Sequence, residues 1–227
     1  MQMLPPLEQT PLPHPTMTQS KAGLTFRDRF WKRSFDLIVS FVGLLLVWWL
    51  ILLTYLIACM DTRRSGLYVQ ERIGRKGKPF KMLKIRSMHE MPSVTTTVTT
   101  SHDSRITPVG QFLRKTKLDE LPQLLNVLLG QMSLVGPRPD VAGFADKLEG
   151  RDRIILSVRP GIIGPGTLKY LYEEELLARQ HDPEKYNREV IFPDKVKMNR
   201  EYVENYSFLT DLRYIYQTML RLRYHQK

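Results

Sequence analysis

The sequence predicts a mostly helical α/β protein that is anchored to a membrane by one N-terminal hydrophobic helix. Two observations carry this prediction. Residues 37–60 contain no charged side chain, and the chain after them combines short strand-like segments with longer segments of helical periodicity. We expect three parts: a disordered leader over residues 1–20, a membrane anchor over residues 21–62, and a cytoplasmic domain over residues 63–227.

Composition and net charge limit which binding partners and which kinds of metal site the chain is expected to have. The 227 residues carry a formal net charge of +11 with a pI near 9.8, which favours anionic partners such as phosphorylated substrates, anionic lipid or nucleic acid. Cys59 is the single cysteine, so no disulfide or cysteine-based metal site is expected. The five histidines show no zinc-ligand spacing.

The leader, residues 1–20, is rich in Pro, Gln and Thr and carries almost no charge. This composition favours disorder. It lacks the basic opening of a signal peptide, and the apolar run begins too late for one.

The apolar run has two compatible topologies. Its roughly 24 residues would form about 36 Å of helix, enough to cross a hydrocarbon core of about 30 Å. A buried core helix is the alternative, but a domain of this size has no core that would enclose it. Basic residues flank the run on both sides, which favours a re-entrant hairpin because a single span is normally basic on the cytoplasmic side only. The midpoint, Trp48-Trp49, has no proline to break the helix, which favours a straight span. The basic flanks are Lys21, Arg27, Arg29, Lys32 and Arg33 before the run, and Arg63, Arg64, Arg72, Arg75, Lys76 and Lys78 after it.

Short elements are expected next. Residues Leu67–Glu71 and Pro79–Ile85 read as strands around a basic turn at 74–77, and residues 91–104 as a Thr/Ser-rich loop. Thr107 reads as an N-cap followed by Pro108 at the first helical position, so a helix is expected to about Arg114.

A second helix is predicted to start near Asp119 and to end before Gly130. Leucines at 121, 124, 125 and 128 fall on one face, which we expect to meet either a core or a membrane surface. Residues 159–166 form a rigid Gly/Pro loop. Helical segments are then predicted over Leu171–Gln180, Pro183–Val190, Pro193–Glu204 and Phe208–Arg223. The last is amphipathic, which suits either an anionic bilayer or core packing.

The candidate site centres on an acidic pair, Asp119 and Glu120. Arg114 precedes the pair, and Arg138 follows in a turn between Pro137 and Pro139. Two carboxylates can bind a metal and supply a nucleophile, and arginines can hold phosphate, which together suit phosphoryl transfer. The alternative is structural, because Asp and Glu are also typical of helix N-termini. Lys84 and Arg86 of KMLKIRSM add further positive charge.

Several motifs, in order, resemble the bacterial sugar transferases. They are KRSFD at 32–36, ERIG at 71–74, KMLKIRSM, the long block RITPVGQFLRKTKLDELPQLLNVLLGQMSLVGPRPD at 105–140, VRPGIIG at 158–164 and YSFLTDL at 206–212. These monotopic phosphoglycosyl transferases move a sugar 1-phosphate from a UDP-sugar to polyprenyl (undecaprenyl) phosphate. The resemblance covers nearly everything after residue 30.

The resemblance implies roles for individual residues. Asp119 matches the family's nucleophile and Glu120 its dyad partner, both as ligands of Mg²⁺. Arg114, Arg138, Lys84 and Arg86 match its phosphate-binding region. It also implies a place at the bacterial inner (cytoplasmic) membrane with the catalytic domain on the cytoplasmic face, and a part in starting surface glycan assembly. Nucleic acid is not an expected partner, and a homodimer is left open.

The chain departs from the family pattern at two places. Trp48-Trp49 stands where the family often has Ser-Pro, which puts the hairpin in question. Asn199 stands where a family aspartate is expected, with Asp194 nearby as a substitute, which puts one substrate-binding residue in question. The competing function is a non-enzymatic basic anchor or assembly scaffold on anionic lipid, which leaves the acidic pair and the Arg138 turn unexplained.

Overall fold

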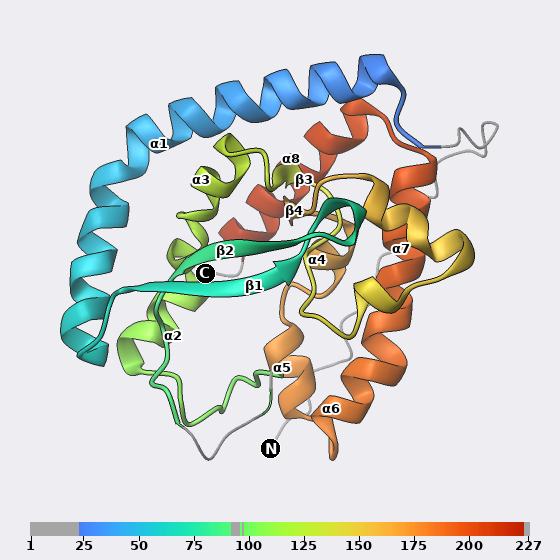
Figure 1. Ribbon diagram of the computed structural model, residues 1–227. Coiled ribbons are helices and arrows are strands. Elements are labelled where there is room, and N and C mark those ends of the chain that lie inside the picture. The colour runs from blue at the N-terminus through green and yellow to red at the C-terminus, as the bar shows by residue number, and fades with distance from the viewer. Residues whose placement is uncertain (1–22, 92–95, 97, 225–227) are drawn as a thin grey trace.

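The computed structural model describes residues 23–91, 96 and 98–224 (Figure 1). The leader predicted over residues 1–20 lies outside the described residues. The remainder is mostly helical with two small sheets, in agreement with the predicted class.

The segment predicted as a membrane anchor contains one continuous helix, α1 (Phe26–Thr62), which curves along one side of the remaining structure (Figure 1). A capping box starts it: Asp28 N–H donates to Thr25 Oγ1 (3.2 Å) and Thr25 N–H to Asp28 Oδ2 (3.0 Å). It ends at Arg63, whose φ of 52° is left-handed. By length and composition, α1 is long and apolar enough to cross a membrane.

The outward face of α1 is apolar and its inward face is polar or small. Its buried residues are Lys32, Asp36, Ser40, Thr54, Ala58 and Thr62, whereas most of its large apolar side chains are exposed. A soluble helix has the opposite arrangement.

Both ends of α1 pack on the same body of protein. Near its start, Asp36 Oδ1 accepts a hydrogen bond from Leu134 N–H (3.0 Å). Near its end, Ala58 is fully buried with Ile85 and Leu113. The two ends therefore lie against one surface rather than pointing away from each other.

Two sheets follow α1. Strands β1 (Leu67–Ile73) and β2 (Pro79–Ile85) form an antiparallel hairpin in which Leu67 faces Ile85; β1 is two residues longer than predicted. Strands β3 (Ser133–Val135) and β4 (Gly161–Ile163) pair in parallel and were not predicted as strands. A Cβ at Gly161 would lie 2.1 Å from Gly136 N, so this crossing requires glycine.

The predicted helices are present with shifted bounds. Helix α2 (Pro108–Lys115) is capped by Thr107 as predicted. The helix expected near Asp119 begins with a 3₁₀ turn, Leu118–Glu120, and continues as α3 (Gln123–Leu128). The other predicted helices are α5 (Glu173–Ala178), α6 (Pro183–Tyr186) with a π-helical extension over Asn187–Ile191, α7 (Phe192–Glu204) and α8 (Phe208–Tyr224). Helix α4 (Pro165–Lys169) was not predicted, and it begins inside the segment expected to be a Gly/Pro loop.

Helix α3 turns its polar face inward. Gln123, Asn126 and Val127 are buried, whereas Leu125 is exposed and Leu129 is 65% exposed. Of the two surroundings predicted for the leucine stripe, its solvent-facing part fits a membrane surface, while Leu124 packs against the core beside Gly43 of α1. Helix α8 is divided in the same way: Ile215 packs on the core, and Leu209, Tyr216 and Met219 are exposed.

Candidate active site

The acidic pair lies in the 3₁₀ turn Leu118–Glu120. Lys117 precedes the turn with a left-handed φ of 59°, and Glu120 N–H donates to the Lys117 carbonyl (3.2 Å). No side chain caps this turn or α3, so the interpretation of Asp119 as a helix cap is wrong. The pair must therefore be explained by its other surroundings.

Glu120 is held by two cations. Arg138 contacts both of its oxygens, Nη2 to Oε1 at 2.5 Å and Nη1 to Oε2 at 3.3 Å, and Lys84 Nζ of β2 lies 3.3 Å from Oε1. Burial alone would raise the pKa of Glu120, but Arg138 and Lys84 together hold that pKa well below its usual range. Glu120 is therefore a fixed negative charge, and it raises the pKa of Arg138 in turn.

Asp119 has the opposite surroundings. Its side chain is buried, with the residue 4% exposed, and Oδ1 has no hydrogen-bond partner among the described residues. Burial raises the pKa of Asp119; Lys84 and Arg114 oppose this rise, and the charge of Glu120 adds to it. A desolvated carboxylate with an unpartnered oxygen is a stronger nucleophile than a hydrated one.

The turn that carries Arg138 is fixed by backbone hydrogen bonds on both sides. Gly136 N–H donates to the Ile163 carbonyl and Gly161 N–H to the Pro137 carbonyl, both at 2.8 Å, and Ile73 N–H donates to the Asp140 carbonyl (2.9 Å). With Pro137 and Pro139 restricting φ, the backbone has little freedom. The guanidinium is thereby positioned toward Glu120.

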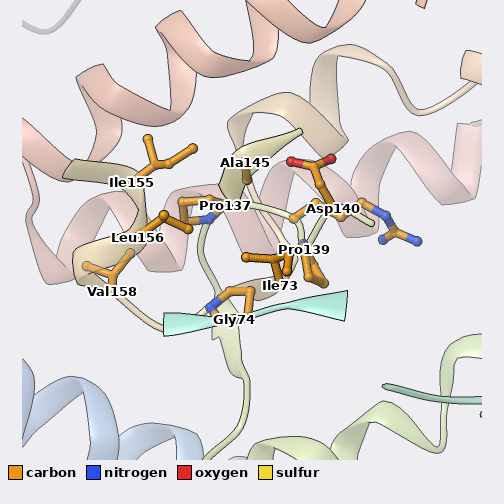
Figure 2. A pocket seen from close by; sticks show the side chains of 11 residues that line it. Ile73, Gly74, Pro137, Pro139, Asp140, Ala145, Ile155, Leu156 and Val158 are labelled. Carbon is orange, nitrogen blue, oxygen red and sulfur yellow. The ribbon is translucent and has the colours of Figure 1, made fainter. Parts of the chain in front are cut away.

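A small pocket lies under this turn (Figure 2). Ile155, Leu156 and Val158 line one side of it, and the Asp140 side chain lies at the other (Figure 2). Burial raises the pKa of Asp140 to about 6, although Lys195 and Arg72 oppose the rise. Burial and the nearby Arg138 also lower the pKa of Arg72 to about 10.

Arg114 is near the pair but is engaged by another carboxylate. Its guanidinium forms an ion pair with Glu174 at the start of α5, and Nη1 donates to Ser87 Oγ (3.3 Å). Next to Glu174, Glu173 pairs with Lys195 of α7 (2.5 Å). The first turn of α5 therefore neutralises two cations on the side of the site that α2 and α7 border.

Two other predicted site residues are not brought to the pair by any contact within the described residues. Arg86 donates to the Ser65 carbonyl (2.8 Å) and pairs with Glu90 (2.8 Å). Asn199 is buried on α7 beside Gly166, with Oδ1 unpartnered. Asp194, the nearby aspartate, binds Lys169 and Tyr170, both at 2.7 Å.

The donor set fits a magnesium ion that is shared with substrate. Among the described residues, no group of three or more His, Cys, Asp or Glu is placed to hold a metal by itself. Magnesium is commonly held by one or two carboxylates with substrate phosphates and water completing the shell. The unpartnered Asp119 oxygen fits that mode. Both Glu120 oxygens already contact Arg138, so Glu120 would join a metal only by giving up one of these contacts.

Sequence reasoning missed three residues near the site: Gln123, Asp140 and Glu174. The motif that contains Gln123 and Asp140 was recognised, but Gln123 is singled out only by its burial and missing partners, and Asp140 only by the pKa that burial raises. Glu174 gives no signal in the sequence beyond an acidic first turn.

Comparison with known proteins decides the family. Residues 27–224 match the family model described as bacterial sugar transferase. The chain belongs to the bacterial sugar transferase family. The match covers α1 and both sheets as well as the acidic pair, so the anchor helix is part of the family unit.

Named relatives of this bacterial sugar transferase come from several bacteria. Exopolysaccharide production protein ExoY of Sinorhizobium fredii is 33% identical over 204 residues, covering 83% of each chain. A putative undecaprenyl-phosphate N-acetylgalactosaminyl 1-phosphate transferase of Bacillus subtilis is 40% identical over 119 residues, 52% of this chain and 66% of the relative. UDP-glucose:undecaprenyl-phosphate glucose-1-phosphate transferase of Escherichia coli is 33% identical over 200 residues, 86% of this chain and 40% of the relative.

Proposed function

We propose that this bacterial sugar transferase moves a sugar 1-phosphate from a UDP-sugar to undecaprenyl phosphate, releasing UMP. The names of the relatives from E. coli and B. subtilis support the two substrates. The observation that carries the proposal is the contrast within the acidic pair: Glu120 is neutralised by two cations, while Asp119 keeps a buried, unpartnered oxygen.

The proposed reaction has two displacements at one phosphorus atom. An Asp119 oxygen bonds to the phosphorus that bears the sugar, the bond to the bridging oxygen breaks, and UMP leaves with that electron pair. A phosphate oxygen of undecaprenyl phosphate then bonds to the same phosphorus, and Asp119 leaves as a carboxylate. Dividing the transfer in this way replaces one difficult step by two easier ones.

The remaining residues hold charge. Lys84 and Arg138 keep Glu120 ionised, and Arg138 keeps further N–H donors for phosphate oxygens. Asp119 and Glu120 are the residues that would hold Mg²⁺, which supplies neutralisation of the diphosphate when bound. When substrate binds, the Arg114 guanidinium would release the Glu174 carboxylate and contact a phosphate group instead.

We also propose that α1 enters the membrane from the cytoplasmic side and returns to it, at the bacterial inner membrane. The support is that its first and last turns both pack on one body, through Asp36 and Ala58, while its apolar face points outward. In a Cys59→Ala background, Ser20→Cys and Ser65→Cys should both resist an impermeant thiol reagent in intact cells and react after lysis. Labelling of Ser20→Cys alone from outside would instead establish a span.

The covalent step has a direct test. The full chain in detergent or nanodiscs is mixed with a single UDP-sugar, and its intact mass is measured. We expect a gain of one phosphosugar with release of one UMP, and loss of the adduct when undecaprenyl phosphate is added. A panel of UDP-glucose, UDP-galactose and UDP-N-acetylgalactosamine identifies the sugar.

Absence of both adduct and UMP with every donor would favour the competing function, a basic anchor or scaffold on anionic lipid. The glycan is proposed from the exopolysaccharide role in the name of the ExoY relative. Deletion of the gene should then reduce exopolysaccharide, and the wild-type chain should restore it while Asp119→Asn should not.

A further inference from the structure

Two buried amides lie three residues apart on the same helix and differ in their partners. Asn126 is 1% exposed; its Nδ2 donates to the Lys81 carbonyl (2.8 Å) and Gln131 Oε1 (2.6 Å), and its Oδ1 accepts from Leu83 N–H (3.0 Å). Gln123 is also 1% exposed, yet neither Nε2 nor Oε1 has a hydrogen-bond partner within the described part of the chain. Asn126 therefore connects α3 to β2 by hydrogen bonds, whereas the Gln123 amide makes no such connection.

Gln123 begins α3 about one helical turn after Asp119. The turns that join them are closed by i→i+3 bonds, with Leu121 N–H donating to the Leu118 carbonyl and Leu125 N–H to the Pro122 carbonyl. The side chains of Asp119 and Gln123 are both buried, and the Asp119 turn and α3 both pack on β2, the strand that carries Lys84.

An unpartnered buried amide is costly. Each such polar group destabilises the folded state relative to a paired one, and a Met or Leu of similar size would avoid this cost. The unpartnered atoms of Gln123 and Asp119 are one donor group, Gln123 Nε2, and two acceptors, Gln123 Oε1 and Asp119 Oδ1, on two segments that pack on β2. A bound phosphoryl group would satisfy the Gln123 Nε2 donor with one of its oxygens, while its phosphorus would bond to the Asp119 oxygen.

We propose that Gln123 is a further catalytic residue, whose Nε2 donates to a non-bridging oxygen of the phosphoryl group while that group bonds to Asp119. The proposal rests on the proposed function. A neutral amide suits this place because it stabilises charge spreading over the phosphoryl oxygens without adding a charge beside Asp119. Removal of one such donor typically lowers the rate by about 10²-fold or more.

The experiment compares Gln123→Met with wild type and with Asn126→Leu in the full chain. Adduct formation from the UDP-sugar is followed by intact mass, and thermal unfolding is followed in the same detergent. Gln123→Met should form the adduct about 10²-fold more slowly and unfold at a higher temperature. Asn126→Leu should unfold at a lower temperature, because it leaves the Leu83 and Lys81 backbone groups unpaired.

A second variant, Gln123→Glu, keeps the shape of the side chain and replaces the donor by an acceptor of like charge to phosphate. It should lose adduct formation at least as strongly as Gln123→Met. Wild-type rates in both Gln123 variants would overturn the inference and leave the proposed function intact. If the wild type itself forms no adduct, it is the proposed function that fails.

Discussion

Two networks of buried carboxylates can be compared in this molecule, one at the anchor and one at the active site. At the anchor, Asp211 of α8 is contacted by Lys32 Nζ of α1 (2.6 Å), Tyr202 OH of α7 (2.6 Å) and Tyr206 OH (3.3 Å). At the site, Glu120 has a similar set of partners, but its neighbour Asp119 has an unpartnered oxygen.

The two networks differ in whether they leave a carboxylate oxygen available to a ligand. Both oxygens of Asp211 are partnered, so that network joins three helices and leaves no capacity for a ligand. The site network joins β2 to the Arg138 turn through Glu120 and leaves Asp119 available. At this site the atom available to a ligand is the unpartnered Asp119 oxygen, not the oxygens of the buried ion pair beside it.

The largest expected effect is that of Asp119→Asn on the reaction. The amide cannot form an acyl phosphate, so adduct formation should fall by at least about 10³-fold, with the unfolding temperature little changed because Oδ1 holds nothing in place. Intact mass and thermal unfolding are measured on the same sample. Near-normal turnover would contradict the covalent mechanism.

Asp211→Asn should damage folding rather than chemistry. It removes the carboxylate that contacts the buried Lys32 ammonium, and breaking a buried pair typically costs about 3–5 kcal/mol. Arg64→Gln, which breaks the exposed pair with Glu90, is the control and should change stability by less than about 1 kcal/mol. The free energy of unfolding in denaturant is measured for both variants. Equal losses would show that the buried and the exposed ion pair contribute equally to stability.

Arg138→Lys should lower the rate of adduct formation by about 10²-fold, or roughly 3 kcal/mol. Lysine keeps the charge but cannot contact both Glu120 oxygens and phosphate at once. Arg151→Lys is a matched control, because Arg151 makes the same two-point contact with Glu204 at the surface. Loss of activity in both variants would show that the effect is not specific to the site.

The smallest expected effect is the pH-dependent one of Asp140→Asn. The pKa of Asp140 is about 6 in the folded protein and about 3.9 when unfolded. Between these two pH values the folded state binds more protons than the unfolded state. The ionised Asp140 carboxylate therefore destabilises the folded protein above pH 6, and this destabilisation disappears toward pH 4. The variant should therefore be more stable by about 2–3 kcal/mol at pH 7.5 and nearly equal to wild type near pH 4. A gain of equal size at both pH values would exclude ionisation as the cause.

Local chemistry explains which elements the sequence predicted well. The residues of β2 and the Thr107-Pro108 start of α2 are set by neighbours in the chain, and the structure confirms both. The parallel pairing of β3 with β4 depends on Gly136 meeting Gly161, which no local pattern encodes. The start of α3 moved because Lys117 adopts a left-handed φ and forces a 3₁₀ turn.

The sequence predicted which charged residues form the candidate site, but it did not predict which of them pair with each other. The sequence placed Asp119, Glu120 and Arg138 in one motif, and the structure brings Arg138 onto Glu120. Partners from distant segments, such as Glu174 for Arg114, depend on tertiary packing. Gln123 was missed because the period of the leucines identifies the apolar face of the helix, whereas in the structure the buried face of α3 includes Gln123 and Asn126.

The continuous packing of α1 has a practical consequence for producing the protein. A shortened chain that begins at residue 63 would lose Asp36, which caps the edge of β3, and Lys32, the counter-charge of Asp211. It would also uncover Ile85 and Leu113, which Ala58 shields. Removal of the hydrophobic helix to obtain a water-soluble enzyme should therefore yield an aggregating fragment, and solubility is better sought by replacing the outward-facing apolar residues of α1 while its inward face is kept.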